Sequence, residues 1–209
     1  MTEHTTHDLS TPAGVWAALK EGNERFATDQ TLAPNRDSAR RQSLTAGQNP
    51  IAAVIACSDS RVPVELLLDA GFGDVFVIRN AGGCIDSSVS GSVEFAVEDL
   101  GVSLVLFLSH ERCGAVGAAI QGVNSAALPT NLTRVFVEKI APSVITAQAN
   151  GEVDRSEIER THAKVTAEHL IARIPALRSG IDAGTVAVVG ARYRLEDGRV
   201  ETVYENFGD

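Results

Sequence analysis

Short apolar runs alternate along this chain with segments whose apolar residues recur at helical spacing. The apolar runs, which are typical of strands buried on both faces, lie at 51–56, 75–78, 102–108 and 185–190. Helical patterns occupy 11–28, 63–70, 87–100, 114–121, about 131–149 and about 155–177. A turn signal at Asp197-Gly198 leads to 200–204, where the alternation predicts an outer strand. We therefore expect an α/β fold in which helices cover both faces of a mostly parallel central sheet of four strands with an outer fifth strand.

The first fifty residues differ from the rest because they contain a helical pattern and a polar stretch but no apolar run. The helix expected at 11–28 carries Trp16, which we expect to pack against a core or a partner subunit; stacking on a ligand is the alternative. A chain of 209 residues can form one domain with a single substantial core. We expect one domain, with an N-terminal helical arm at about 1–50 and an α/β core at 51–209.

The composition limits the partners and the compartment. A net charge of -9 repels nucleic acid phosphates and anionic lipid headgroups, so a small molecule is the better substrate. No apolar run approaches the roughly 18 residues needed to cross a bilayer, and Met1–Ser10 lacks the features of a secretory signal. Three cysteines cannot form a complete disulfide framework. These features favour a cytoplasmic protein that does not associate with membranes or nucleic acid.

Polar side chains follow three of the expected strands, at Cys57, Arg79 and His110. In open parallel sheets, ligands bind beyond the carboxyl ends of the strands. Cys57, His110 and Cys113 form a ligand set that suits zinc, and three protein ligands leave the fourth position open for catalysis. The alternatives are buried free thiols and a structural zinc site, for which Cys84 is the nearest additional cysteine.

Asp59 and Arg61 follow Cys57 at intervals of two residues. In an extended segment this spacing places the three side chains on one side of the backbone. Asp59 and Arg61 can then form a charge-assisted pair beside the metal; a solvated surface pair is the alternative. A structural zinc site has no need of such a pair. The pair of Asp59 and Arg61 therefore favours an enzyme over the alternative of a non-catalytic, zinc-stabilised binding protein.

Three motifs resemble those of the β-class carbonic anhydrases: Cys-Ser-Asp-Ser-Arg-Val from Cys57, Gly-Asp-Val-Phe-Val-Ile-Arg-Asn-Ala-Gly from Gly73, and His-x-x-Cys-Gly-Ala-Val from His110. The resemblance extends to 19–26 and 189–193, and so covers most of the chain. It implies one zinc ion per chain, held by Cys57, His110 and Cys113. It also implies a homodimer or a dimer of dimers.

The implied activity is the reversible hydration of carbon dioxide to bicarbonate by zinc-bound hydroxide, which a dyad of Asp59 and Arg61 orients. In a closed state of such enzymes the aspartate becomes the fourth zinc ligand. A hydrolase of carbonyl sulfide or carbon disulfide on the same scaffold is the alternative, because these linear electrophiles react similarly.

The resemblance also assigns a substrate pocket. Phe76, Ala81 and Phe95 match positions in its wall, although on sequence alone Phe76 and Phe95 are core aromatics by default. Many members of the family carry tyrosine where this chain has Phe95. Gln48 matches a hydrogen-bond donor that faces the substrate across the dimer interface.

Overall fold

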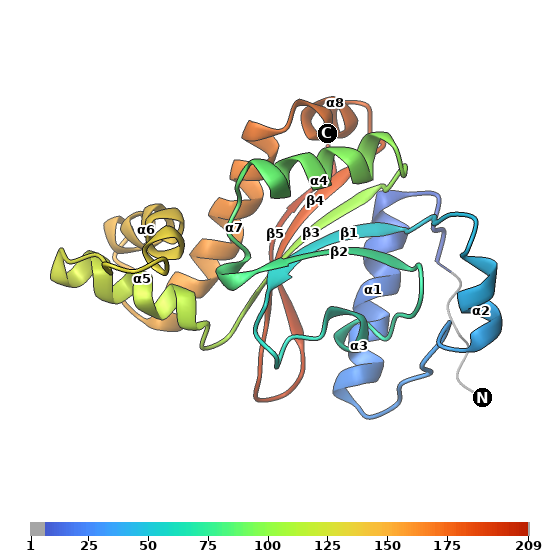
Figure 1. Cartoon of the computed structure of the whole chain (residues 1–209), viewed down its shortest axis with the longest axis horizontal. Coiled ribbons are helices and arrows are strands. Elements are labelled where there is room, and N and C mark those ends of the chain that lie inside the picture. Colours follow the sequence, from blue (N-terminus) through green and yellow to red (C-terminus); the bar gives the residue numbers. More distant parts are fainter. Residues whose placement is uncertain (1–6, 209) are drawn as a thin grey trace.

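The computed structural model describes residues 7–208, and a five-stranded sheet runs through its centre (Figure 1). The strand order is β2 (Val75–Asn80), β1 (Ala52–Cys57), β3 (Leu104–His110), β4 (Ala187–Tyr193) and β5 (Val200–Asn206). The first four strands are parallel, and β5 pairs with β4 in the antiparallel sense. The predicted mostly parallel sheet with an outer fifth strand is confirmed.

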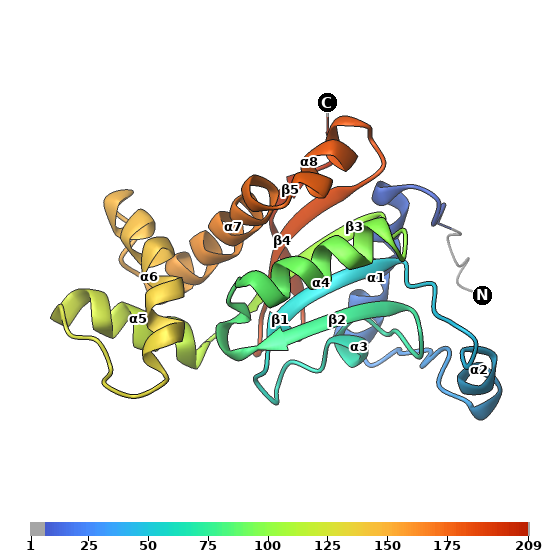
Figure 2. The same cartoon turned by 45° about the horizontal axis from the view of Figure 1, so that its top comes forward.

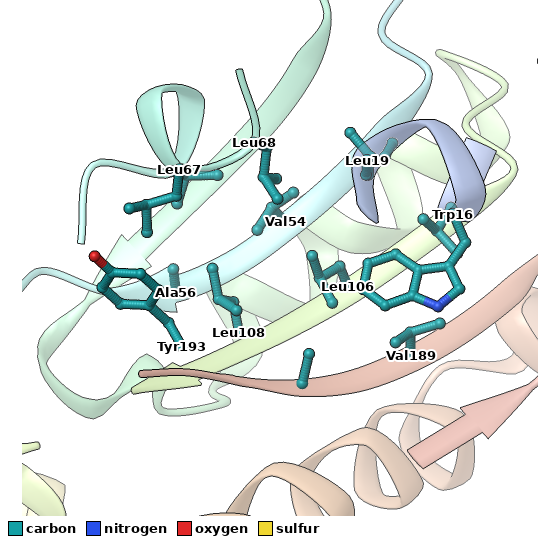
Figure 3. Close-up of a cluster of buried hydrophobic side chains, with 14 of the residues drawn as sticks. Trp16, Leu19, Val54, Ala56, Leu67, Leu68, Leu106, Leu108, Val189 and Tyr193 are labelled. Atoms are coloured by element: carbon teal, nitrogen blue, oxygen red, sulfur yellow. The ribbon is translucent and has the colours of Figure 1, made fainter. Parts of the chain in front are cut away.

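Helix α1 (Pro12–Ala27) and the short α3 (Val64–Leu67) cover one face of the sheet. The side chain of Thr11 accepts a hydrogen bond from the backbone N–H of Gly14 and so begins α1. Trp16 is 2% exposed and packs in this core (Figure 3). Its indole N–H donates to the Glu205 carboxylate at 2.7 Å. Trp16 is therefore a core residue of its own chain.

Helices α4 (Ser87–Glu98), α7 (Arg155–Arg173) and α8 (Pro175–Asp182) cover the opposite face. The sequence predicted one helix over 155–177, and this prediction is wrong. Pro175 lacks an N–H, and Ile174 before it adopts an extended conformation, so α7 ends and α8 begins anew.

Helices α5 (Gly114–Ser125) and α6 (Arg134–Ala149) pack against each other beyond the end of the sheet where β1 and β3 end (Figure 2). They form a third apolar cluster, which includes Cys57, Cys84 and Cys113. Within residues 7–208, no helix is both long and apolar enough to cross a bilayer. The first six residues of the polar N-terminal stretch lie outside the described part of the chain.

Two further predictions need correction. The helix expected at 63–70 is only α3, because Asp69 has a φ of 46° and its buried carboxylate accepts the backbone N–H groups of Leu32 and Ala33. Strand β2 is half-buried rather than buried, since it lies at an edge of the sheet. The polar segment before the sheet contains α2 (Ser38–Ser43), as the expected loop or short helix allows.

Candidate metal centre

Three residues with metal-ligating side chains lie together at the carboxyl edge of the sheet. Cys57 ends β1, His110 ends the neighbouring β3, and Cys113 immediately precedes α5. Between His110 and Cys113 the chain turns at Arg112, which has a φ of 55°. The ligand atoms of Cys57, His110 and Cys113 lie within 4.8 Å of one another, and all three residues are buried. The fold thus assembles the expected ligand set from two neighbouring strands.

The imidazole of His110 is oriented by the backbone of the next residue, Glu111. Nδ1 lies 2.9 Å from the carbonyl oxygen of Glu111, which can only accept, so Nδ1 carries the proton. Nε2 therefore has a free lone pair. It is the one buried side-chain nitrogen or oxygen among residues 7–208 that has no hydrogen-bond partner. A buried unpaired acceptor beside two thiols fits zinc, which satisfies it by coordination.

Two backbone N–H groups point at the sulfur of Cys57. Gly82 N lies 3.3 Å and Asp59 N lies 3.4 Å from Sγ. Hydrogen bonding from Cys113, together with His110 and these two N–H groups, lowers the pKa of the Cys57 thiol. This environment favours the thiolate, which is the form that binds metal.

Gly82 is the residue whose backbone conformation makes this contact possible. Its φ is 76°, and a Cβ placed there would lie 2.7 Å from Ile140 Cδ1 and 2.9 Å from Ala115 Cβ. A residue with a side chain would therefore be strained in this left-handed backbone conformation, and its Cβ would clash with the α5–α6 cluster. Glycine at position 82 allows the chain to approach the thiol closely.

Asp59 and Arg61 form a pair beside the three ligands. Arg61 Nε and Nη2 donate to the two carboxylate oxygens at 2.9 and 2.7 Å, and the Arg61 backbone N–H also donates to Asp59 Oδ1 at 2.9 Å. These contacts, led by the Arg61 side chain, hold the pKa of Asp59 well below its usual range. Asp59 Oδ2 lies 3.8 Å from His110 Nε2. The expected pairing is therefore present next to the ligand atoms.

Arg79 has a role that its place in the sequence does not reveal. Its Nε donates to the Cys57 carbonyl at 3.0 Å, and its Nη2 donates to the Asp59 carbonyl at 2.8 Å. Arg79 thus fixes the backbone on which a metal ligand and the carboxylate stand. The sequence signal was its position near the end of β2, beside β1, but the target of a guanidinium cannot be inferred from position.

One of the four expected pocket residues, Ala81, lies near the ligands, and the other three lie elsewhere in the chain. Ala81 follows Asn80, which pairs with Cys57 in the sheet, so it lies near the ligands. Phe76 and Phe95 lie together, with ring centroids 6.1 Å apart, but Phe76 pairs with Ala53 toward the other end of β1. Gln48 is exposed and precedes β1, so the strand length, about 20 Å, separates it from Cys57 of its own chain.

Cys84 lies close to the centre but is not in the ligand cluster of the described residues. Its backbone N–H donates to the Asn80 side chain at 2.6 Å, and its carbonyl accepts from the same side chain at 2.8 Å. Burial, with the nearby charge of Cys57, raises the pKa of the Cys84 thiol to about 12. Because the sulfur of Cys84 is not among the ligand atoms that lie within 4.8 Å of one another, this site offers three ligands rather than four.

The protein is thus of the open α/β class, with a Cys-His-Cys cluster that could hold a metal ion at the carboxyl edge of its mostly parallel sheet. A family model described as carbonic anhydrase matches residues 52–200. The chain belongs to the carbonic anhydrase family, in its β class, and this membership supports carbonate dehydratase activity.

Relatives match nearly the whole chain. Carbonic anhydrase 2 of Mycobacterium tuberculosis is 44% identical over 188 residues, which cover 90% of this chain and 91% of the relative. The carbonic anhydrase of Mycolicibacterium smegmatis is 44% identical over 192 residues, covering 92% and 93%.

Two solved structures share the fold at lower sequence identity. The Coccomyxa β-carbonic anhydrase in complex with acetazolamide has a TM-score of 0.72 and 21% identity over 90% of this chain and 86% of that one. A tetrameric β-carbonic anhydrase from Sordaria macrospora has a TM-score of 0.69 and 23% identity over 78% and 85%. The α/β architecture predicted from the sequence is therefore that of known β-carbonic anhydrases.

Proposed function

We propose that the chain catalyses the reversible hydration of carbon dioxide to bicarbonate and a proton, with one zinc ion per chain held by Cys57, His110 and Cys113. The observation that carries the proposal is the clustering of these three ligand atoms within 4.8 Å, around a buried imidazole nitrogen that has no other partner. Zinc, when bound, supplies Lewis acidity that makes water nucleophilic near neutral pH.

Asp59 orients the attacking water by accepting its hydrogen bond at Oδ2, the carboxylate oxygen nearest to His110 Nε2. Arg61 keeps this carboxylate ionised and directed, since it occupies both oxygens. The same two hydrogen bonds engage both carboxylate oxygens and therefore favour an open state, in which Asp59 would not be a metal ligand. Asp59 as a fourth ligand requires that the pair with Arg61 be broken.

The substrate pocket is completed by a second copy of the chain. Phe76, Phe95 and Gln48 lie away from the cluster of their own chain, and Phe95 is 43% exposed. In a homodimer, or a dimer of dimers, these three residues line the apolar approach to the partner's zinc, beside Ala81. The tetrameric Sordaria relative supports an assembly of this kind.

The three cysteines are free thiols, which suits a cytoplasmic location. The whole chain acts as one domain.

Stopped-flow measurement of carbon dioxide hydration, with the zinc content determined on the same sample, tests the activity. We expect one zinc per chain and rapid hydration, with loss of zinc in Cys113→Ser and loss of hydration but retention of zinc in Asp59→Ala. Sulfide release from carbonyl sulfide or carbon disulfide without carbon dioxide hydration would overturn the proposal in favour of the alternative hydrolase. Full activity in Asp59→Ala would refute the role of the dyad.

Mixing two variants tests the shared pocket. In a dimer of one Asp59→Ala chain and one Gln48→Ala chain, action across the interface leaves one of the two sites intact, whereas action within a chain leaves both impaired. We therefore expect that co-refolding the two variants restores activity that neither has alone. Absence of restoration in a verified heterodimer would place Gln48 outside the partner's site.

A further inference from the structure

An ion pair with no direct access to solvent lies behind the metal centre. Arg192 in β4 and Glu159 in α7 each have side chains that are 1% exposed, and Nη2 and Nε of Arg192 lie 3.2 and 3.3 Å from Glu159 Oε2. Burying such a pair costs desolvation free energy, and replacing it by apolar residues is often neutral or stabilising. The stability of the fold alone therefore does not account for it.

One branch of hydrogen bonds leads from this pair to Cys113. The second oxygen of Glu159, Oε1, accepts from Arg155 Nε at 3.0 Å. Arg155 then donates from Nη2 to the carbonyl oxygen of Cys113 at 2.7 Å. The backbone of one candidate zinc ligand is thus tied to the buried charge by two consecutive hydrogen bonds.

A second branch leads to His110. Arg192 Nη2 also lies 3.5 Å from Glu111 Oε1, and Glu111 Oε2 accepts the backbone N–H of Leu195 at 2.9 Å. The backbone carbonyl of Glu111 is the group that orients the His110 imidazole. Arg192 therefore holds the residue whose backbone determines which imidazole nitrogen faces the centre.

The outer side of the network fixes the position of Arg192 itself. Glu201 in β5 lies 3.5 Å from Arg192 Nη1 and accepts from Arg160 Nε at 2.8 Å. The Arg192 guanidinium thus has three carboxylates within 3.5 Å, those of Glu159, Glu111 and Glu201. A guanidinium held on several sides has little freedom to change its geometry.

We propose that Arg192 is a positioning residue that, through Glu159–Arg155 and through Glu111, holds Cys113 and His110 in the geometry that zinc requires. The inference rests on the proposed zinc site. Residues that orient metal ligands typically change metal affinity or activity by about 10-fold to 100-fold when substituted. The network gives the same kind of support to two of the three ligands at once.

Zinc affinity measured against a chromophoric chelator tests this proposal without reference to catalysis. Arg155→Met cuts the branch to Cys113 at a side chain that is 46% exposed, so the variant should fold. We expect its zinc affinity to fall by about 10-fold or more. We expect the visible absorption of the cobalt-substituted protein to change as well, since it reports ligand geometry.

The double variant Arg192→Met with Glu159→Met removes both buried charges together and leaves neither unpaired. We expect it to lose zinc affinity at least as strongly as Arg155→Met, at a similar unfolding midpoint. Arg25→Met is the matched control, because it breaks the 2.8 Å pair with the buried Asp69, which does not belong to this network. It should lose stability but keep the zinc affinity and the cobalt spectrum.

Wild-type zinc affinity and an unchanged cobalt spectrum in folded Arg155→Met would overturn the proposal. Arg155→Met also decides the outcome if the double variant fails to fold. Failure of the proposed function is distinguishable: a protein that binds zinc but does not hydrate carbon dioxide would still show these differences in affinity. A wild-type protein that binds no zinc would remove the basis of both.

Discussion

Substitution of Gly82 by alanine should destabilise the protein in two separable ways. The left-handed backbone conformation costs an L-residue about 1–2 kcal/mol, and overpacking of a filled core costs about 1–3 kcal/mol. The overpacking follows from the positions of Ile140 Cδ1 and Ala115 Cβ, 2.7 and 2.9 Å from the added Cβ. The sum, about 2–5 kcal/mol, corresponds to a fall in Tm of roughly 4–20 °C for a chain of this size.

Two other glycines separate the contributions. Gly101 has a φ of 68°, and a Cβ added there would have no atom within 4 Å, so Gly101→Ala should lose only about 1–2 kcal/mol. Gly91 lies in α4 with equally open surroundings, and Gly91→Ala should gain about 0.5–1 kcal/mol. Urea unfolding of the three variants as zinc-free proteins measures these differences. If Gly82→Ala is as stable as Gly101→Ala, the steric part of the reasoning is refuted.

Three further outcomes are expected. Burial lowers the pKa of His162 to about 4, so the unfolded chain takes up the proton first, and the free energy of unfolding should fall as pH drops from about 6.5 to 4. His162→Gln should flatten this pH dependence in urea titrations; an unchanged dependence would contradict it. Cys84, whose thiol pKa is raised to about 12, should resist iodoacetamide at pH 8 in peptide mass spectra, and Cys84→Ala should keep one zinc per chain; rapid native alkylation would argue against a protonated thiol. Trp16→Phe removes the hydrogen bond to Glu205 and should lower the free energy of unfolding in urea by about 1–3 kcal/mol. Glu205→Gln keeps an acceptor for the indole N–H and should lower it less; equal losses in the two variants would show that the indole N–H contributes little.

The central sheet was predictable because its strands are buried on both faces. The runs that became β1 and β3 contain almost only apolar residues, and their polar neighbours Cys57 and His110 mark the ends that meet at one edge. Strand β2 carries a similar apolar pattern although it is an edge strand, so its exposure could not be inferred. The apolar composition of a segment indicates that the segment can be buried. It does not indicate whether the segment becomes a central strand or an edge strand.

Contacts between distant segments were the part that the sequence could not supply. Arg192 and Glu159 lie 33 residues apart on a strand and a helix, and nothing in their local sequence marks them as a buried pair. The same holds for the hydrogen bonds from Arg79 to the backbone of Cys57 and Asp59. Pro175, which can end a helix, stands in the sequence, but apolar residues at helical spacing lie on both sides of it, so a single helix was expected there. Charged side chains have many possible partners, and only the fold selects among them.

The metal-ligating residues and Arg192 lie far apart along the chain, so they are synthesised at different times. The three candidate ligands are complete once Cys113 has emerged, whereas β4 and Arg192 follow about 80 residues later. At about 5–20 residues per second, a ribosome needs roughly 4–16 s for this interval. During that time β3 has no β4 beside it, and Arg192 is not available behind His110 and Cys113. The ligands of the metal centre are thus made early, and Arg192, the central residue of the network behind them, arrives last.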